Sequence, residues 1–331
     1  MTELTRKPTL PNLFQFATSE ASQDAVLCWL LSWAKPEYGH LDPLLHRTAL
    51  DFIERIFHLH SVSMPKVISR VEVTRQDNYI DVLCVLNDEY VILIEDKTHT
   101  EDHSNQLVNY LNEVSGRGYE RDKVLPVYYK TEDQGCYRRV VKKGYQPFTR
   151  PMMLQVLNRY PGDNAIVLDY RAYLTHIQQR SDSYITEPVE RWSQRAWKGY
   201  FLYLQRELGV GTWRYVPNKN GGFMGFWWHF VGDDDCEQYL QIEEKKLCVK
   251  IGVAEASQQK ALRQFWYENV KERAKTFAPA QWSKPPRFGT GACMTVYQFK
   301  GDFRVVNDDG RIDLESTLAR LRQSQRLLTS I

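Results

Sequence analysis

Along the first third of the chain, the spacing of apolar residues changes from helical to strand-like. From Glu20 to Ala34 apolar residues recur three or four positions apart, and Asp42 followed by Pro43 joins a helix-capping residue to one suited to a first turn. The pattern predicts two helices, the second running to about His58. The strand-like segments that follow are β-branched and aliphatic, and they cover Val67–Val73, Ile80–Leu86 and Tyr90–Ile94.

The next stretch predicts a mixed sheet flanked by helices. In order, the predicted elements are a helix over Asp102–Val114, a strand over Val124–Tyr129, a helix over Thr149–Tyr160, a strand over Ala165–Leu168 and a helix over Tyr170–Gln179. Between Tyr129 and Phe148 the chain is basic and rich in turn-forming residues, which is typical of a loop. This order indicates an α/β (α+β) fold.

A domain boundary is predicted near Ser181–Pro188, which is polar and has no periodicity. We therefore expect one domain over residues 1–182 and a C-terminal α+β domain over residues 183–331, serving substrate recognition, sensing or dimerisation. Its predicted elements are helices over Pro188–Leu208, Ser257–Phe277 and Asp313–Leu328 and strands over Trp213–Val216, Phe223–Phe230, Tyr239–Ile242, Leu247–Val253 and Met294–Phe299.

Composition narrows the class of protein. With 43% hydrophobic and 25% charged residues, the chain has the balance of a soluble globular protein. No apolar run is long enough to span a bilayer, and the polar first residues do not resemble a signal peptide, so we expect a cytoplasmic protein without a membrane partner. The net charge is +2, but residues 186–331 carry 22 basic against 17 acidic residues and the rest 21 against 24. This asymmetry favours an acidic metal site in the first half and a phosphate-facing surface in the second.

The segment Asn78–Lys97 carries the strongest chemical signal. Two strands flank Asn87–Glu89, which predicts an antiparallel hairpin with a three-residue loop. In that register Asp81 faces Glu95, with Cβ atoms ~4.5–5.5 Å apart. Side chains alternate along a strand, so Glu95 and Lys97 share a face while the residue between them points away.

Two carboxylates this close repel each other unless one is protonated or a cation lies between them. Oxygen ligands favour Mg²⁺ or Mn²⁺ over zinc, and such an ion polarises a phosphate and lowers the pKa of a bound water. Lys97 could orient or deprotonate that water and stabilise the transition state. The alternative is a solvated strand end with a salt bridge. Against it, Tyr90–Ile94 is continuously apolar, as in a central strand, and Asp81 also lies in an apolar strand.

Asp81, thirteen intervening residues and then Glu95-x-Lys97 on a hydrophobic strand resemble the motif of the PD-(D/E)XK nuclease superfamily. Its members share a restriction-endonuclease-like α-β-β-β-α-β core, an order that fits residues from about 15 to 180. The resemblance implies that Asp81 and Glu95 ligate the metal and that Lys97 is the catalytic lysine. Ile80 replaces the proline of the motif, at a position that varies widely in the superfamily.

Gln106 and Tyr110 form a Q-x-x-x-Y pattern that is similar to RecB-like nucleases. Their i, i+4 spacing puts both on one helical face, and the resemblance implies a role at the active centre and toward DNA. The alternative is an ordinary amphipathic helix that turns Leu107 and Leu111 inward.

Glu20 lies on the first predicted helix, which in many members supplies an additional metal-site acid, and Asp24 follows one turn later. The alternative is that such acids only stabilise the helix dipole. The opening NLFQFATSEASQDAVLCWLLSWA resembles a subfamily found in bacterial and prophage genomes.

Basic and aromatic residues suggest substrate contacts. The basic set is Arg138, Arg139, Lys142 and Lys143, with Lys130 and Arg150 nearby. We expect the first four to contact DNA phosphates, although charge runs are often only solvated surface. The aromatic segment Gly221–Phe230 favours a core strand or a homodimer interface over stacking on unpaired bases. His99 and His103 match no motif and are interpreted as exposed loop residues.

Together these features predict an enzyme, a Mg²⁺- or Mn²⁺-dependent nuclease that hydrolyses DNA phosphodiester bonds. The resemblance implies a setting in phage defence or mobile-element biology. Two alternatives stay open: a nucleic-acid-binding or scaffolding protein on a nuclease fold, and an RNase or ligand-activated nuclease. The intact Asp81, Glu95 and Lys97 argue against the scaffold, because a decayed site usually loses one of them.

Overall fold

The computed structural model describes residues 11–98, 100, 102, 105–218, 221–277 and 280–328. The chain divides into two compact units, one up to Gln179 and one from Arg180 on. The division falls inside helix α6, Ala165–Thr186. The predicted boundary around Ser181–Pro188 therefore begins within a helix and not in a polar linker. Within the described ranges, none of the helices is both long and apolar enough to cross a bilayer.

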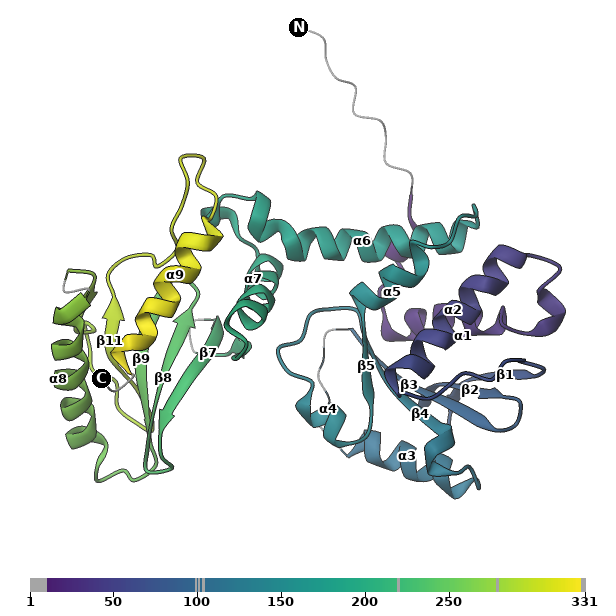
Figure 1. The fold of residues 1–331 in the computed structure, drawn as a ribbon, viewed down its shortest axis with the longest axis horizontal. Helices are drawn as coiled ribbons and strands as arrows, with labels where there is room; N and C mark the ends of the chain where they lie inside the picture. Colours follow the sequence, from purple (N-terminus) through teal and green to yellow (C-terminus); the bar gives the residue numbers. More distant parts are fainter. Residues whose placement is uncertain are drawn as a thin grey trace, which may run out of the picture. The chain divides into compact units, whose positions relative to one another are not determined.

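The N-terminal unit contains a five-stranded mixed sheet in the order β1-β2-β3-β4-β5 (Figure 1). The strands are β1 Val71–Asp77, β2 Ile80–Leu86, β3 Tyr90–Lys97, β4 Val124–Lys130 and β5 Gln146–Thr149. β2 pairs antiparallel with both β1 and β3, and β4 and β5 run parallel to β3. As the central strand, β3 is buried at every position between its two end residues.

Helices cover both faces of this sheet (Figure 1). They are α1 Glu20–Ser32, α2 Pro43–Leu59, α3 Gln106–Gly116, α4 Arg138–Lys142, α5 Arg150–Leu157 and α6. Residues of α1, α2, α5 and α6 share one hydrophobic core with Val82 and Ile94, whereas α3 and α4 share the other with Leu83 and Leu93. The mixed α+β fold with helices on a mixed sheet is thus confirmed.

Two predictions in this unit were wrong. Ala165–Leu168 is the first turn of α6 and not a strand, and α6 buries Val167, Tyr170 and Leu174 at helical spacing. A short apolar run does not reveal its period, which explains the error. The fifth strand is instead β5, within the stretch interpreted as a loop that also contains α4. Both elements are too short, at four and five residues, to establish a period of their own.

The C-terminal unit is a six-stranded antiparallel sheet in the order β10-β11-β9-β8-β7-β6. Its strands are β6 Thr212–Val216, β7 Phe223–Gly232, β8 Cys236–Glu243, β9 Lys246–Val253, β10 Trp282–Ser283 and β11 Cys293–Phe299, and its helices are α7 Gln194–Leu208, α8 Gln259–Phe277 and α9 Leu314–Ser324. Along the described chain, short 3-10 turns lie at Leu13–Gln15, Pro36–Tyr38, Arg121–Lys123, Val189–Arg191 and Gln325–Leu327.

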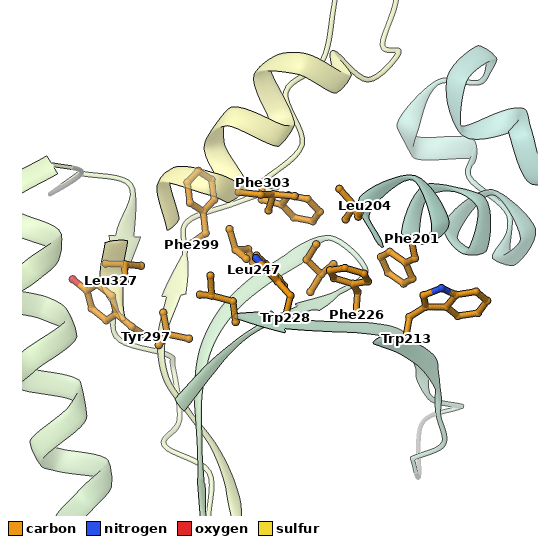
Figure 2. Packing of buried hydrophobic residues seen from close by; sticks show 14 of the residues in the cluster. Phe201, Leu204, Trp213, Phe226, Trp228, Leu247, Tyr297, Phe299, Phe303 and Leu327 are labelled. Carbon is orange, nitrogen blue, oxygen red and sulfur yellow. The ribbon is translucent and has the colours of Figure 1, made fainter. Parts of the chain in front are cut away.

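One hydrophobic core joins all three helices of this unit to a single face of its sheet. Figure 2 shows Phe201 and Leu204 of α7 against Phe226 and Trp228 of β7. The ring centroids of Phe201 and Phe226 are 5.5 Å apart, as are those of Phe226 and Trp228. The other face of the sheet keeps Arg214 and other side chains exposed.

Candidate active site

The β2–β3 hairpin has the register predicted from the sequence. Its pairs run from Leu86 opposite Tyr90 to Val82 opposite Ile94. In the turn, Asn87 and Asp88 have φ values of 54° and 57°, which Asn and Asp tolerate better than most residues. The turn therefore fixes the alignment that brings Asp81 and Glu95 to the same end of the hairpin.

Asp81 is the second residue of β2, directly after the turn that joins β1 to β2. Its carboxylate contacts β1 and β3. Oδ2 accepts a hydrogen bond from the backbone N–H of Asp96 at 2.9 Å. The Gln76 amide donates both to Asp81 Oδ1 and to Asp24 Oδ2 of α1, each at 3.3 Å. Asp81 thus binds the backbone at the end of β3, and through Gln76 it is linked to Asp24 of α1.

Glu95 and Lys97 form a close pair on the face of the sheet that packs against α3. Lys97 Nζ lies 2.5 Å from Glu95 Oε1, and Glu95 is only 1% exposed. Burial and, to a smaller extent, the charge of Asp81 raise the pKa of Glu95 to about 8, against the opposing charge of Lys97. Burial lowers the pKa of Lys97, but the carboxylates of Glu95 and Asp81 outweigh it and leave this pKa raised. Glu95 and Lys97 thus form an ion pair with little exposure to solvent, in which each side chain shifts the pKa of the other.

Glu20, the first residue of α1, reaches the same strand end. Its Oε1 accepts from the backbone N–H of Thr98 at 2.8 Å, and its Oε2 lies 3.9 Å from Lys97 Nζ. The N-cap Ser19 fixes the start of this helix by accepting from the N–H of Ser22 at 3.2 Å. The structure thus brings the acid expected from the first helix to the lysine.

Sequence reasoning gave Asp96 no role and Asp24 only a minor one, yet both are buried beside the site, at 0% and 1% exposure. Burial and, to a smaller extent, the charge of Asp81 raise the pKa of Asp24 to about 6. Burial also raises the pKa of Asp96 well above its usual range, with Asp24 and Glu20 adding to the shift. The signal available in the sequence was the i, i+4 spacing of Glu20 and Asp24.

Gln106 and Tyr110 lie on α3, which covers the face that carries Glu95. Gln106 Nε2 donates to the Tyr110 hydroxyl at 2.6 Å, so the two act as one unit. Burial raises the pKa of Tyr110, and the charges of Glu95 and Asp81 add to the shift. This coupling puts the Q-x-x-x-Y pair within electrostatic range of the carboxylates.

The basic residues divide into two groups. Arg138, Arg139 and Lys142 are exposed on α4. Lys143, also expected to contact DNA, is half-buried and forms an ion pair with Asp102, in the segment between Lys97 and α3. This contact holds the end of α4 against the segment that follows the site.

Lys130 and Arg150, which lie near the basic residues in the sequence, are buried and bind other parts of the chain, so a substrate cannot reach them. Lys130, 2% exposed, donates to the carbonyl oxygens of Thr98 at 2.9 Å and Thr100 at 2.5 Å, which holds the chain just after Lys97. Arg150, 1% exposed, is 2.7 Å from Asp133 Oδ1. His99 and His103 lie outside the described residues.

The donor set fits a hard divalent cation. Both oxygens of Glu95 are buried: Oε1 lies against the Lys97 ammonium, and Oε2 accepts no hydrogen bond from the described residues. Those residues contain no group of three or more His, Cys, Asp or Glu side chains suited to a metal ion. Mg²⁺ does not require such a cage, because it keeps several waters and often takes only one or two carboxylates. Asp81 and Glu95 meet that smaller requirement.

Comparisons with known proteins found no match among protein-family models, curated proteins or solved structures.

Proposed function

We propose that the N-terminal unit is a divalent-metal-dependent nuclease that hydrolyses DNA phosphodiester bonds. One observation carries the proposal: Asp81, Glu95 and Lys97 converge at the end of one hairpin, where burial and mutual charge perturb the pKa values of Glu95 and Lys97. Buried groups whose pKa values are perturbed by desolvation and by a specific charge partner cluster at functional sites. The resemblance to the PD-(D/E)XK motif supports the same reading.

Asp81 and Glu95 would hold the cation, with Glu20 as a further oxygen donor. Bound there, Mg²⁺ or Mn²⁺ supplies Lewis-acid polarisation of a phosphate oxygen and a water of lowered pKa. Glu95 offers a buried Oε2 that accepts no hydrogen bond from the described residues, beside an Oε1 that is paired with Lys97. Asp81 is held in place by the Asp96 N–H, and Glu20 by the Thr98 N–H.

Lys97 supplies the positive charge of the site. Its ammonium lies 2.5 Å from Glu95 and 3.9 Å from Glu20, and its side chain is 15% exposed. From this position it can donate a hydrogen bond to a phosphate oxygen and stabilise the negative charge that grows in the transition state. Its raised pKa favours this electrostatic role over that of a general base.

Substrate contacts are assigned to two elements. Tyr110, hydrogen-bonded to Gln106, lines the α3 side of the site and can orient the scissile phosphate. On α4, the exposed Arg138, Arg139 and Lys142 can neutralise the phosphates of a strand.

A cleavage assay on single-stranded DNA, double-stranded DNA and RNA, with Mg²⁺, Mn²⁺ or EDTA, tests the proposal. We expect DNA cutting that needs the metal and that falls about 10²–10⁴-fold in Lys97→Ala. Lys66→Ala, at an exposed lysine outside the site, is the matched control and should cut normally. Equal cutting by Lys97→Ala would reject the mechanism.

The alternatives give different outcomes in this assay. Tight DNA binding without cutting would indicate a binding or scaffolding protein, and cutting of RNA alone an RNase. DNA cutting that appears only after a small ligand is added would indicate a ligand-activated nuclease.

A further inference from the structure

The face of the C-terminal sheet opposite α7, α8 and α9 contains a hollow of about 460 Å³. Its lining comes from β6, β7, β8, β9 and β11, which makes it about 19 Å wide at ~4.8 Å per strand. We call five of its lining residues the aromatic face: Arg214, Phe223, Trp227, Phe230 and Tyr239. All lie within the C-terminal unit.

The aromatic face depends on a β-bulge in β7. Met224, Phe226 and Trp228 alternate into the core, so regular alternation would send Phe230 there too. The pairing with β8 instead shifts between Trp228 and Val231, where His229 has a φ of 54°. Val231 then packs against the core, and Phe230 is 48% exposed. Bulges often re-aim a side chain beside a functional site.

Trp227 is held in one orientation by a chain of polar contacts. Its Nε1 donates to Gln241 Oε1 at 2.7 Å, and Gln241 Nε2 donates to Glu243 Oε1 at 2.8 Å. Lys250 Nζ donates to the same Glu243 oxygen at 2.8 Å. A Cβ at Gly225 would lie 2.6 Å from the indole, so glycine makes room for the ring. An aromatic platform fixed in this way loses little entropy when a ring stacks on it.

Further residues of the hollow offer a ring, a positive charge and a carboxylate, the groups that bind a base and its phosphate. Phe230 and Tyr239 stack with centroids 5.3 Å apart and planes at 26°. The exposed Arg214 guanidinium lies 5.7 Å from the centroid of Trp227, and none of the described acids lies within ion-pair distance of it. Glu237 also lines the hollow and can accept hydrogen bonds from the amino groups of bases.

We propose that the aromatic face binds single-stranded nucleic acid, with unpaired bases on Trp227 and on Phe230, which is backed by the buried Tyr239, and a phosphate at Arg214. Aromatic rings with interspersed cations are the usual platform for single strands, because every base has a π face. The excess of basic residues over residues 186–331, 22 against 17, complements a polyanion. The proposed site consists of residues of the C-terminal unit alone, and binding there requires no cleavage.

Binding of a fluorescent 20-nucleotide single strand to the full chain in EDTA, followed by anisotropy, tests the proposal. We expect Trp227→Ala and Arg214→Gln each to weaken binding about tenfold. Phe265→Ala, at a 56% exposed ring on α8, and Arg287→Gln, at an exposed arginine outside the hollow, should bind as wild type does. Arg214 donates no hydrogen bond to another described residue, so its variant tests the site even if Trp227→Ala unfolds.

Photocross-linking of a strand that carries 5-iodouracil locates the contact, and we expect cross-links within Phe223–Tyr239. Unchanged affinity in Trp227→Ala and Arg214→Gln, or cross-links only in the N-terminal unit, would overturn the proposal. So would binding of free mononucleotides but not of the strand, which would indicate a small-ligand pocket. A homodimer that dissociates in Trp227→Ala, with no effect on the strand, would indicate a second copy of this chain.

Discussion

The two sheets of this protein are covered differently. The N-terminal sheet has helices on both faces, and its charged site residues gather where β2 begins and β3 ends. The C-terminal sheet packs α7, α8 and α9 on one face and leaves Arg214, Phe230 and Glu237 exposed on the other.

This difference decides where each unit can place chemistry. A sheet covered on both faces buries its strand centres, so polar groups act from strand ends, in a dry environment that strengthens charge interactions. A sheet covered on one face can present a row of side chains directly to a ligand. The first arrangement suits catalysis on a phosphate, and the second suits a broad contact with a single strand of nucleic acid.

The largest expected effect is at the strand end of the N-terminal sheet. Asp81→Asn keeps the shape of the side chain but removes the charge, so metal-dependent cleavage should fall about 10³-fold. Asp88→Asn, in the exposed turn of the same hairpin, is the control and should leave cleavage unchanged. A comparable loss in both variants would mean that the hairpin, and not its carboxylate, is what matters.

Neighbouring tryptophans on β7 test the two faces of the C-terminal sheet. Trp228 is fully buried in the core, so Trp228→Ala should lower the free energy of unfolding by about 3–5 kcal/mol. Trp227 is half-buried on the aromatic face and makes one side-chain hydrogen bond, so Trp227→Ala should lower it by only about 1 kcal/mol. Chemical denaturation measures both. Equal losses would contradict the assignment of one face to packing and the other to binding.

The buried Glu95 predicts a pH dependence of stability. Its pKa is raised from 4.5 to about 8, so the folded state prefers the protonated form. The corresponding stability is fully present below about pH 4.5 and is lost as the pH rises through 8. The melting temperature of the metal-free protein should therefore fall by a few degrees between pH 5 and pH 8.5.

Glu95→Gln should flatten this decline, because the amide does not titrate. Glu37→Gln, at an exposed residue, is the control and should follow the wild-type curve. Mg²⁺ should raise the melting temperature of the wild type most at the alkaline end, where Glu95 is charged. A Glu95→Gln curve parallel to that of the wild type would show that Glu95 does not titrate in this range.

The smallest expected effect is at Tyr110. Tyr110→Phe removes a hydroxyl that accepts one hydrogen bond from Gln106, so cleavage should fall about threefold to tenfold. Tyr79→Phe, at an 82% exposed ring, serves as the control. A loss as large as that of Asp81→Asn would give Tyr110 a direct part in the chemistry.

Features that depend on the spacing of residues within one strand, hairpin or helix could be predicted from the sequence. Alternation along β2 and β3, with a short turn between them, gave the register and the face shared by Glu95 and Lys97. The spacing of Gln106 and Tyr110 likewise predicted their contact on one helical face.

Features that depend on tertiary contacts could not be predicted. Nothing in a single sequence separates Lys130, which is buried and supports the chain after Lys97, from the exposed Arg138. Asp96 is buried although its residue type predicts exposure. The bulge that turns Phe230 outward depends on pairing with β8.

The central claim is that Asp81 and Glu95 hold a divalent cation beside Lys97. A crystal structure with Mn²⁺, with anomalous scattering to locate the ion, tests it most directly. The account predicts an anomalous peak about 2.0–2.2 Å from carboxylate oxygens of both Asp81 and Glu95, absent in Asp81→Asn. A peak bound only by Asp24 and Asp96, or no peak in crystals of protein that still cleaves DNA with Mn²⁺, would contradict it.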